Sequence, residues 1–251
     1  DGDRRGRVSG RFGSLGDEYV TGALCGGSMG RDAVYYVDLP GGTWDMTVDT
    51  IGSVADTVLG LGTDCSVDGL ALICNDDMDP GRVEASRIFT HRVQAGGGGL
   101  RFYILVEGYD AGERGDYVVN VFLESAHSDS CGASGGRPLD ITGGGTVLGF
   151  QPGFTGTSRG SCMPVTDFDE ESVLTFESSS ATPALAVYST DFVPDLFVRA
   201  GCAAGSEVAC DVGSDLGGGV NAASVFPRVT PATPHVVYVD GRGSYVLVYS
   251  P

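Results

Sequence analysis

The residues best suited to chemistry form a short acidic segment at 75–81, which reads Asn-Asp-Asp-Met-Asp-Pro-Gly. Oxygen side chains at its alternate positions are typical of calcium loops, because Ca²⁺ prefers about six to eight oxygen ligands. The segment is not an EF-hand, since Pro80 replaces the required glycine and Ser86 stands where the last glutamate belongs. A calcium site is therefore weighed against a solvated acidic turn. The predicted ligands are Asn75, Asp76, Asp77 and Asp79.

A nucleophile pattern of serine hydrolases, G-x-S-x-G, occurs at residues 26–30 and 132–136. We attribute both matches to chance, because the chain has 41 glycines and neither match lies between a predicted strand and a helix. None of the three histidines has a serine or cysteine partner at a recognisable spacing. The sequence therefore predicts no catalytic residues, and we expect the protein not to be an enzyme.

The charge of the chain excludes several classes of function. All 15 basic residues are arginine, and they stand against 33 acidic residues, for a net charge of −18. Such a chain repels nucleic acids and anionic membranes. The absence of lysine excludes a nucleotide-binding P-loop, Schiff-base chemistry and a Lys–Asn isopeptide crosslink. No apolar run approaches the length of about 18 residues that spans a membrane. We expect no nucleic-acid partner and no membrane insertion.

The seven cysteines favour disulfides over a zinc site. No C-x-x-C pair occurs, and three histidines are a poor supply of further zinc ligands. Disulfides form in oxidising compartments, so the sequence predicts a secreted protein. The chain begins at Asp1 without an initiator methionine, which favours a mature product or an excised piece.

Two copies of one unit make up the chain. Residues 32–37 (DAVYYV) match residues 171–176 (ESVLTF) at an offset of 139, from 171 − 32. Residues 56–59 (DTVL) match residues 195–198 (DLFV) at the same offset, from 195 − 56. Two separate segments that share one offset indicate an internal repeat.

The pattern of the apolar residues predicts strands. Short stretches rich in Val, Tyr, Phe and Leu are broken by Gly, Asp, Ser and Pro, with no sustained helical spacing. Alternation over residues 117–122 fits an antiparallel strand with one better-buried face. The fold class is therefore predicted to be all-β, with two tandem antiparallel β-sandwiches. We place the copies at 1–126 and 127–251, joined through a Gly/Ser-rich connection at 125–145.

An ordered set of short motifs resembles a known family. The motifs are 32–35 (DAVY), 56–59 (DTVL), 74–77 (CNDD), 103–109 (YILVEGY) and 115–117 (GDY). This set is similar to bacterial pre-peptidase C-terminal (PPC-like) domains, secreted modules that often follow protease catalytic domains. The resemblance covers the chain from Gly10 onward and implies a jelly-roll-like sandwich without catalytic residues, with occasional calcium. In the second copy, residues 211–213 read Asp-Val-Gly, so we expect calcium in the first copy only.

The repeat also guides the predicted disulfides. Two short stretches, each bounded by cysteines, recur at equivalent places and are predicted to be closed as hairpin-sized loops. The predicted pairs are Cys65–Cys74, Cys202–Cys210 and Cys131–Cys162. Cys25 is then left over, and the separation 162 − 131 = 31 would put its partner upstream of Asp1. Either a preceding segment carries that partner or Cys25 bonds a neighbouring subunit, and we favour the neighbouring subunit.

The resemblance also implies roles in adhesion, substrate targeting, secretion or surface architecture. We expect a non-catalytic structural or adhesive protein, secreted by a bacterium or held at its cell surface. It would be a homo-oligomer or polymer, as a subunit of an extracellular filament or surface assembly, with a carbohydrate or protein matrix as a further partner. The alternative is a substrate-targeting or binding module from a larger secreted protease or other hydrolase. Calcium is the only expected cofactor.

Overall fold

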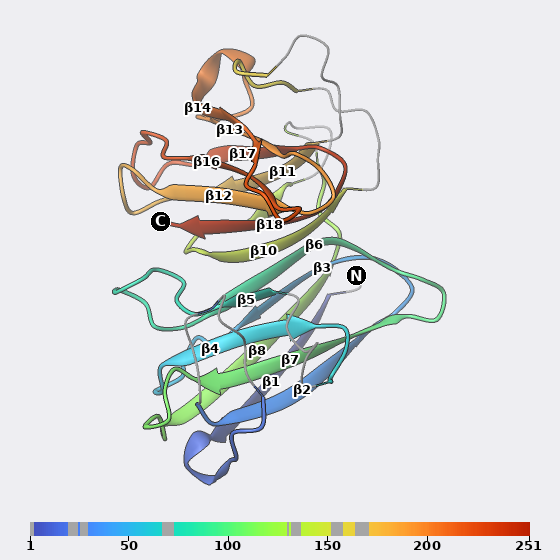
Figure 1. Ribbon diagram of the computed structural model, residues 1–251, viewed down its shortest axis with the longest axis vertical. Helices are drawn as coiled ribbons and strands as arrows, with labels where there is room; N and C mark the ends of the chain where they lie inside the picture. The colour runs from blue at the N-terminus through green and yellow to red at the C-terminus, as the bar shows by residue number, and fades with distance from the viewer. Residues whose placement is uncertain are drawn as a thin grey trace. The chain divides into compact units, whose positions relative to one another are not determined.

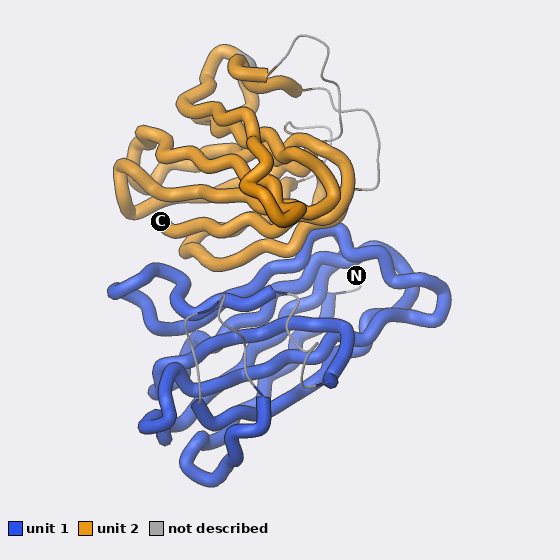
Figure 2. The backbone as a smooth tube through the Cα atoms, viewed as in Figure 1, with its two compact units in different colours: residues 1–126 blue, residues 127–251 orange. Residues whose placement is uncertain are grey.

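The protein is all-β and divides into two compact units, Asp1–Ala126 and His127–Pro251 (Figure 2). The computed structural model describes residues 3–19, 25, 30–66, 73–129, 131, 137–151, 158–163 and 171–251. Besides strands and loops, the described part contains short 3₁₀ helices of three residues each. None of these helices is long and apolar enough to cross a membrane.

The first unit contains two antiparallel sheets of four strands each (Figure 1). The first sheet has the order β1-β8-β3-β6, with β1 at Arg4–Arg11, β8 at Asp116–Ser125, β3 at Gly42–Asp49 and β6 at Arg87–Ala95. The second sheet has the order β2-β7-β4-β5, with β2 at Asp32–Leu39, β7 at Leu100–Gly108, β4 at Thr57–Gly62 and β5 at Ile73–Asn75.

The second unit also contains two sheets. The first has the order β10-β18-β12-β16-β15, with β10 at Gly145–Gln151, β18 at Gly243–Ser250, β12 at Ala184–Ser189, β16 at Asn221–Val225 and β15 at Ser214–Asp215. The second has the order β9-β11-β17-β13-β14, with β9 at Leu139–Asp140, β11 at Glu171–Phe176, β17 at His235–Asp240, β13 at Asp195–Arg199 and β14 at Glu207–Val212. Its pairs are antiparallel except β9–β11, which is parallel.

The same strand order runs through both units, so the repeat in the sequence is also a repeat in structure. β1, β8, β3 and β6 correspond to β10, β18, β12 and β16, and β2, β7, β4 and β5 correspond to β11, β17, β13 and β14. A shared detail supports this match: Gly10 lies opposite Tyr117, and Gly149 lies opposite Tyr245. A Cβ atom at either glycine would overlap the ring of that tyrosine, so each glycine makes room for an aromatic side chain.

Contacts between the two sheets hold the first unit together. The Tyr35 hydroxyl on β2 lies 2.8 Å from the Tyr117 hydroxyl on β8, and the Phe12 ring stacks on Tyr117 with centroids 4.6 Å apart. Burial raises the pKa of Tyr117 above its usual range, so this phenol stays protonated and able to share the hydrogen bond. One buried tyrosine thus links both sheets.

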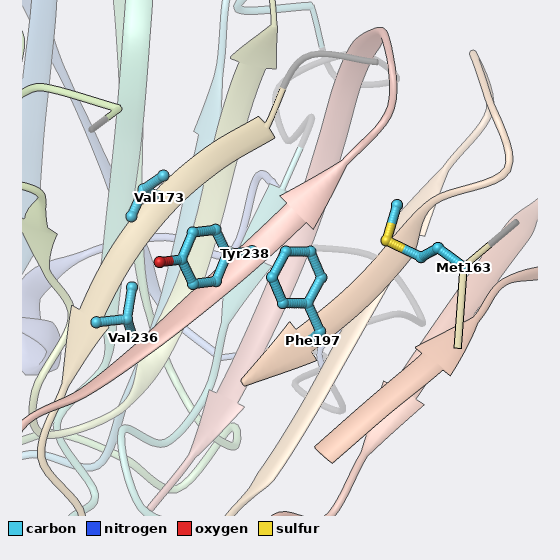
Figure 3. Close-up of a cluster of buried hydrophobic side chains, with 5 residues drawn as sticks. All are labelled: Met163, Val173, Phe197, Val236 and Tyr238. Carbon is cyan, nitrogen blue, oxygen red and sulfur yellow. The ribbon is translucent and has the colours of Figure 1, made fainter. Parts of the chain in front are cut away.

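A second buried cluster lies on β11, β13 and β17 of the second unit and on the segment at 158–163 (Figure 3). Its members are Met163, Val173, Phe197, Val236 and Tyr238. The Phe197 and Tyr238 rings stack with centroids 4.5 Å apart, and the Arg199 guanidinium lies 4.8 Å from the Tyr238 centroid. Stacked aromatic pairs contribute about 0.5–1.5 kcal/mol beyond the burial of their area. The segment at 158–163 therefore covers apolar side chains of this sheet.

The structure contains three disulfides, each within one unit, and they differ from the predicted pairs. The structure bonds Cys25 to Cys74, Cys131 to Cys202 and Cys162 to Cys210, and it leaves Cys65 free and exposed. The predicted pairs Cys65–Cys74, Cys202–Cys210 and Cys131–Cys162 are therefore wrong, as is the prediction that Cys25 is left over.

Strand register explains the error. Gly60 is the residue opposite Cys74, and Phe197 is opposite Cys210. Cys65 and Cys202 each lie five residues further along the chain (65 − 60 and 202 − 197), beyond the ends of β4 and β13. Each hairpin cysteine instead bonds a cysteine that precedes β2 or its counterpart β11 in the chain. Cys25–Cys74 and Cys162–Cys210 are repeat equivalents, with separations of 49 and 48 residues.

We predict that loss of the Cys25–Cys74 bond destabilises the first unit strongly. Closing a loop of this length restricts the unfolded chain by about 4 kcal/mol, against about 2.7 kcal/mol for a ten-residue hairpin loop. A Cys25→Ser/Cys74→Ser variant should lose about that amount in urea unfolding, followed by fluorescence of Trp44, the single tryptophan, which lies in this unit. Cys65→Ser is the control and should leave the midpoint unchanged. A peptide map that joins Cys65 to Cys74 would contradict the pairing.

Candidate metal centre

An acidic cluster forms where β4 begins and β5 ends. These strands are antiparallel neighbours, with Leu59 opposite Asn75, so the start of one lies beside the end of the other. Asp56 directly precedes β4, while Asp76 and Asp77 directly follow β5. One carboxylate oxygen from each of the three aspartates lies within 4.8 Å of the others. Strand pairing therefore assembles three oxygen ligands from two distant parts of the chain.

The electrostatics of this cluster favour a cation. Burial, followed by the charges of Asp77 and Asp56, raises the pKa of Asp76 to about 7. Burial, followed by Asp77 and other nearby acids, raises the pKa of Asp56 to about 6, and burial likewise raises the pKa of Asp77. The Oδ1 atoms of Asp56 and Asp76 are buried without a hydrogen-bond partner. Orphaned buried oxygens among like charges suit a hard divalent ion such as Ca²⁺.

The structure brings together only part of the predicted ligand set. Asp76 and Asp77 belong to the cluster, but Asp79 does not. The Asn75 side-chain oxygen accepts the backbone N–H of Arg87 at 2.7 Å, and its amide donates to the Asp77 carbonyl at 3.2 Å. Asn75 therefore shapes the loop. The Asp79 carboxylate lies 3.5 Å from the Arg82 guanidinium, within a short turn.

Asp56 is the cluster member that the sequence did not predict as a ligand. Its position begins one of the repeated segments, but nothing in a linear pattern shows that β4 and β5 are neighbours. In the second unit the corresponding Asp195 accepts the backbone N–H of Gly213 at 3.1 Å. Asp211 accepts the N–H of Ser224 at 2.7 Å. These two carboxylates accept backbone N–H groups. The described part of the second unit contains no cluster of three acidic side chains like that of the first unit.

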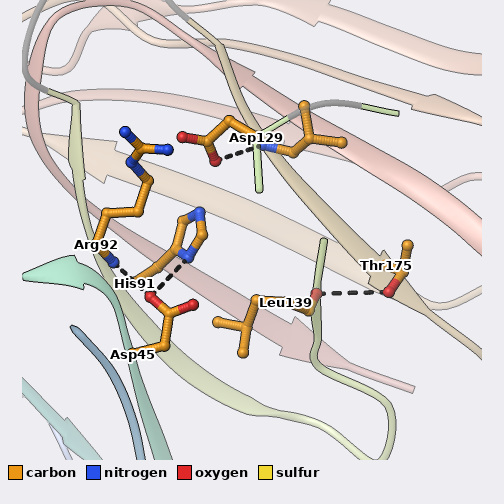
Figure 4. A network of polar contacts seen from close by, with 7 residues as sticks. Asp45, His91, Arg92, Asp129, Leu139 and Thr175 are labelled. Carbon is orange, nitrogen blue, oxygen red and sulfur yellow. Dashed lines mark hydrogen bonds and ion pairs between the residues drawn. The ribbon is translucent and has the colours of Figure 1, made fainter. Parts of the chain in front are cut away.

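A buried histidine and its aspartate partner lie at a β-bulge between β3 and β6. His91 Nδ1 lies 3.2 Å from Asp45 Oδ1, which also accepts the backbone N–H of Arg92 at 2.6 Å (Figure 4). Arg92 has a φ of 58°, and the β3–β6 register shifts between Trp44 and Met46. The Asp45 carboxylate thus anchors the N–H of a residue in left-handed conformation at a β-bulge.

Of the G-x-S-x-G matches, residues 26–29 and 132–136 lie outside the described residues.

No family model matches the chain, and no curated protein matches it.

We predict that the acidic cluster makes stability depend on pH and calcium. Without calcium, the folded carboxyls hold protons that the unfolded chain releases near pH 4, so stability falls as the pH rises from about 4 to about 7. Asp76→Asn should therefore raise Tm by a few degrees in a chelator at pH 7.5, as measured by calorimetry.

Millimolar calcium should raise the Tm of the unmodified chain and have much less effect on Asp76→Asn. Asp79→Asn, which changes an acid of the same loop outside the cluster, should keep the calcium response. A calcium response of equal size in unmodified chain and Asp76→Asn, or none in either, would show that the cluster does not bind the ion.

Proposed function

We propose that the chain is a non-catalytic extracellular structural protein of a bacterium, formed from two tandem jelly-roll-like β-sandwiches of the PPC-like type. It would act as a subunit of a filament or other surface assembly. The observation that carries this proposal is the repetition of one strand order, with an equivalent disulfide in each copy. Duplicated, cross-linked β-units suit a protein whose task is to hold a shape outside the cell.

The disulfides support the expected environment. Three bonds in a chain of this size indicate an oxidising compartment, because cytosolic thiols are kept reduced. The bonds close loops of 48 to 71 residues, which lowers the entropy of the unfolded chain without requiring larger cores. Calcium at the Asp56, Asp76 and Asp77 cluster would stabilise the β4–β5 end of the first unit in the same environment.

The net charge of −18 fits this role as well. Copies of so acidic a chain repel one another, so association requires specific contacts rather than general adhesion. Divalent ions and directional strand pairing are two contacts that overcome such repulsion. Both are compatible with a surface assembly in a calcium-containing medium.

The proposal is tested on native material from cells that make the protein. Antibodies against the chain should label intact cells from outside. Non-reducing electrophoresis should show high-mass species that are converted to single chains on reduction. A native polypeptide that instead continues into a catalytic domain, with hydrolase activity in the same species, would contradict the proposal and favour a substrate-targeting module.

A further inference from the structure

The first sheet of the second unit has an outer face without charged side chains on three neighbouring strands, β18, β12 and β16 (Figure 1). Successive side chains of a strand point to opposite faces of a sheet. The inward side chains belong to the core of the unit: Leu185 and Val187 on β12, for example, are 1% and 0% exposed. The alternate positions therefore form the outer face.

This outer face consists of small and apolar residues. Cross-strand register places Ala186 opposite both Val248 and Ser224, so the outward positions of the three strands lie side by side. The apolar members are Ala184, Ala186, Tyr188, Ala222, Val246 and Val248. The serines are Ser224, Ser244 and Ser250. We call these residues, with Phe226 directly after β16, the uncharged face.

The uncharged face is accessible in the chain. Its members are half-buried or exposed, and its large side chains are the most accessible of them. Tyr188 is 41% exposed, Val248 is 38% exposed and Phe226 is 69% exposed. Aromatic and aliphatic side chains thus stand in solvent without a charged residue between them.

The first unit carries polar and charged side chains at the same positions. Tyr117 and Tyr245, each opposite its glycine, fix the register of β8 against that of β18. The neighbouring strands β3 and β6 then match β12 and β16. The equivalent pairs are Asp116 with Ser244, Asn120 with Val248, Asp49 with Ala186, and Arg87 with Ser224. The sheet therefore tolerates charge at these positions, and the second unit has none there.

An exposed face of this kind requires a partner. Charged residues make up 19% of the chain, and they keep the remaining surface from associating. A contiguous apolar patch without them marks a binding surface or a site of aggregation. A specific occupant that covers the face would prevent aggregation.

The relief of the uncharged face suits a copy of itself. Tyr188 lies opposite Ala222, and Val248 lies opposite Ala186, so each large side chain stands beside a small one. In a contact with two-fold symmetry, the same patch of both copies must be complementary to itself. Rotation about an axis through the face places the large side chains of one copy over the small ones of the other.

The charge of the chain also favours this contact between copies. A second copy brings a net charge of −18, so two copies repel each other wherever their acidic surfaces meet. Contact through the uncharged face leaves the carboxylates at the rim and in water. No charge then loses its hydration without a partner.

We infer that the uncharged face binds the same face of a second copy of this chain, with the two sheets packed about 10 Å apart. The inference rests on the proposed assembly role, and it names the surface through which subunits meet. Strands about 4.8 Å apart and residues about 3.3 Å apart give the face a size of roughly 15 by 20 Å. This is small for a specific interface, so the dimer forms reversibly, with a dissociation constant on the order of micromolar.

The experiment is sedimentation velocity of the purified chain over a range of concentrations. Cys65→Ser is the background, because it removes an exposed thiol that could crosslink copies, and a chelator removes bridging calcium. We expect a monomer–dimer equilibrium under these conditions.

Ala186→Asp/Ser224→Arg tests the face in this background. The double substitution copies the Asp49 and Arg87 pair of the first unit, so it suits this sheet, and it leaves the net charge unchanged. It should raise the dissociation constant at least tenfold. Ala203→Asp, at an exposed position between β13 and β14, is the control and should associate as the background does.

Hydroxyl-radical footprinting of the chain without these substitutions locates the contact independently. The rings of Tyr188 and Phe226 should become less reactive as the dimer forms. Tyr36, which is 60% exposed and lies outside the uncharged face, should keep its reactivity. This measurement decides the question even if the double variant does not fold.

Three results would each overturn the inference. They are a monomer at every concentration up to about a millimolar, a dimer that leaves Tyr188 and Phe226 fully reactive, and a folded double variant that associates as the background does. A monomer that instead sediments with an insoluble polysaccharide would make carbohydrate the occupant of the face. Failure here leaves the cell-surface location untouched, and a failed cell-surface experiment leaves the dimer of the purified chain intact.

Discussion

Both units depend on one equivalent disulfide. It bonds the chain ahead of β2 to β5 in the first unit, and the chain ahead of β11 to β14 in the second. In the second unit, Met163 beside Cys162 packs in the buried cluster with Phe197 and Tyr238. Carboxylates fix the same segment. Asp32 accepts the backbone N–H groups of Glu18 and Tyr19 at 2.7 and 3.0 Å, and its counterpart Glu171 accepts the N–H of Ser158 at 2.9 Å.

The buried carboxylate of Glu107 shows how closely the covering segment approaches. Glu107 is 0% exposed, and its Oε1 atom accepts the backbone N–H of Gly30 at 3.2 Å. A Cβ atom at position 30 would collide with the Gly108 carbonyl, so only glycine allows this approach. The chain is therefore held against β7 by a hydrogen bond to a carboxyl group that has no access to water.

The all-β class and the internal repeat could be predicted from the sequence, because strand periodicity and a shared offset can both be read along the chain. The disulfide pairs were not accessible in this way. Cys65 and Cys74 are close in sequence, but their pairing depends on the register that puts Gly60 opposite Cys74. Asp56 was missed as a member of the acidic cluster for the same reason, since its approach to Asp76 follows from strand pairing. The Asn75 side chain, also predicted as a ligand, hydrogen-bonds the backbone of Arg87 and Asp77.

The central claim is that the two units share one plan, with the same strand order in each. Hydrogen exchange with resolution at single residues tests it directly. We expect the amides of the inner strands β4 and β7 and of their counterparts β13 and β17 to be the best protected in their units. Fast exchange of one of these strands while its counterpart stays protected would contradict the account.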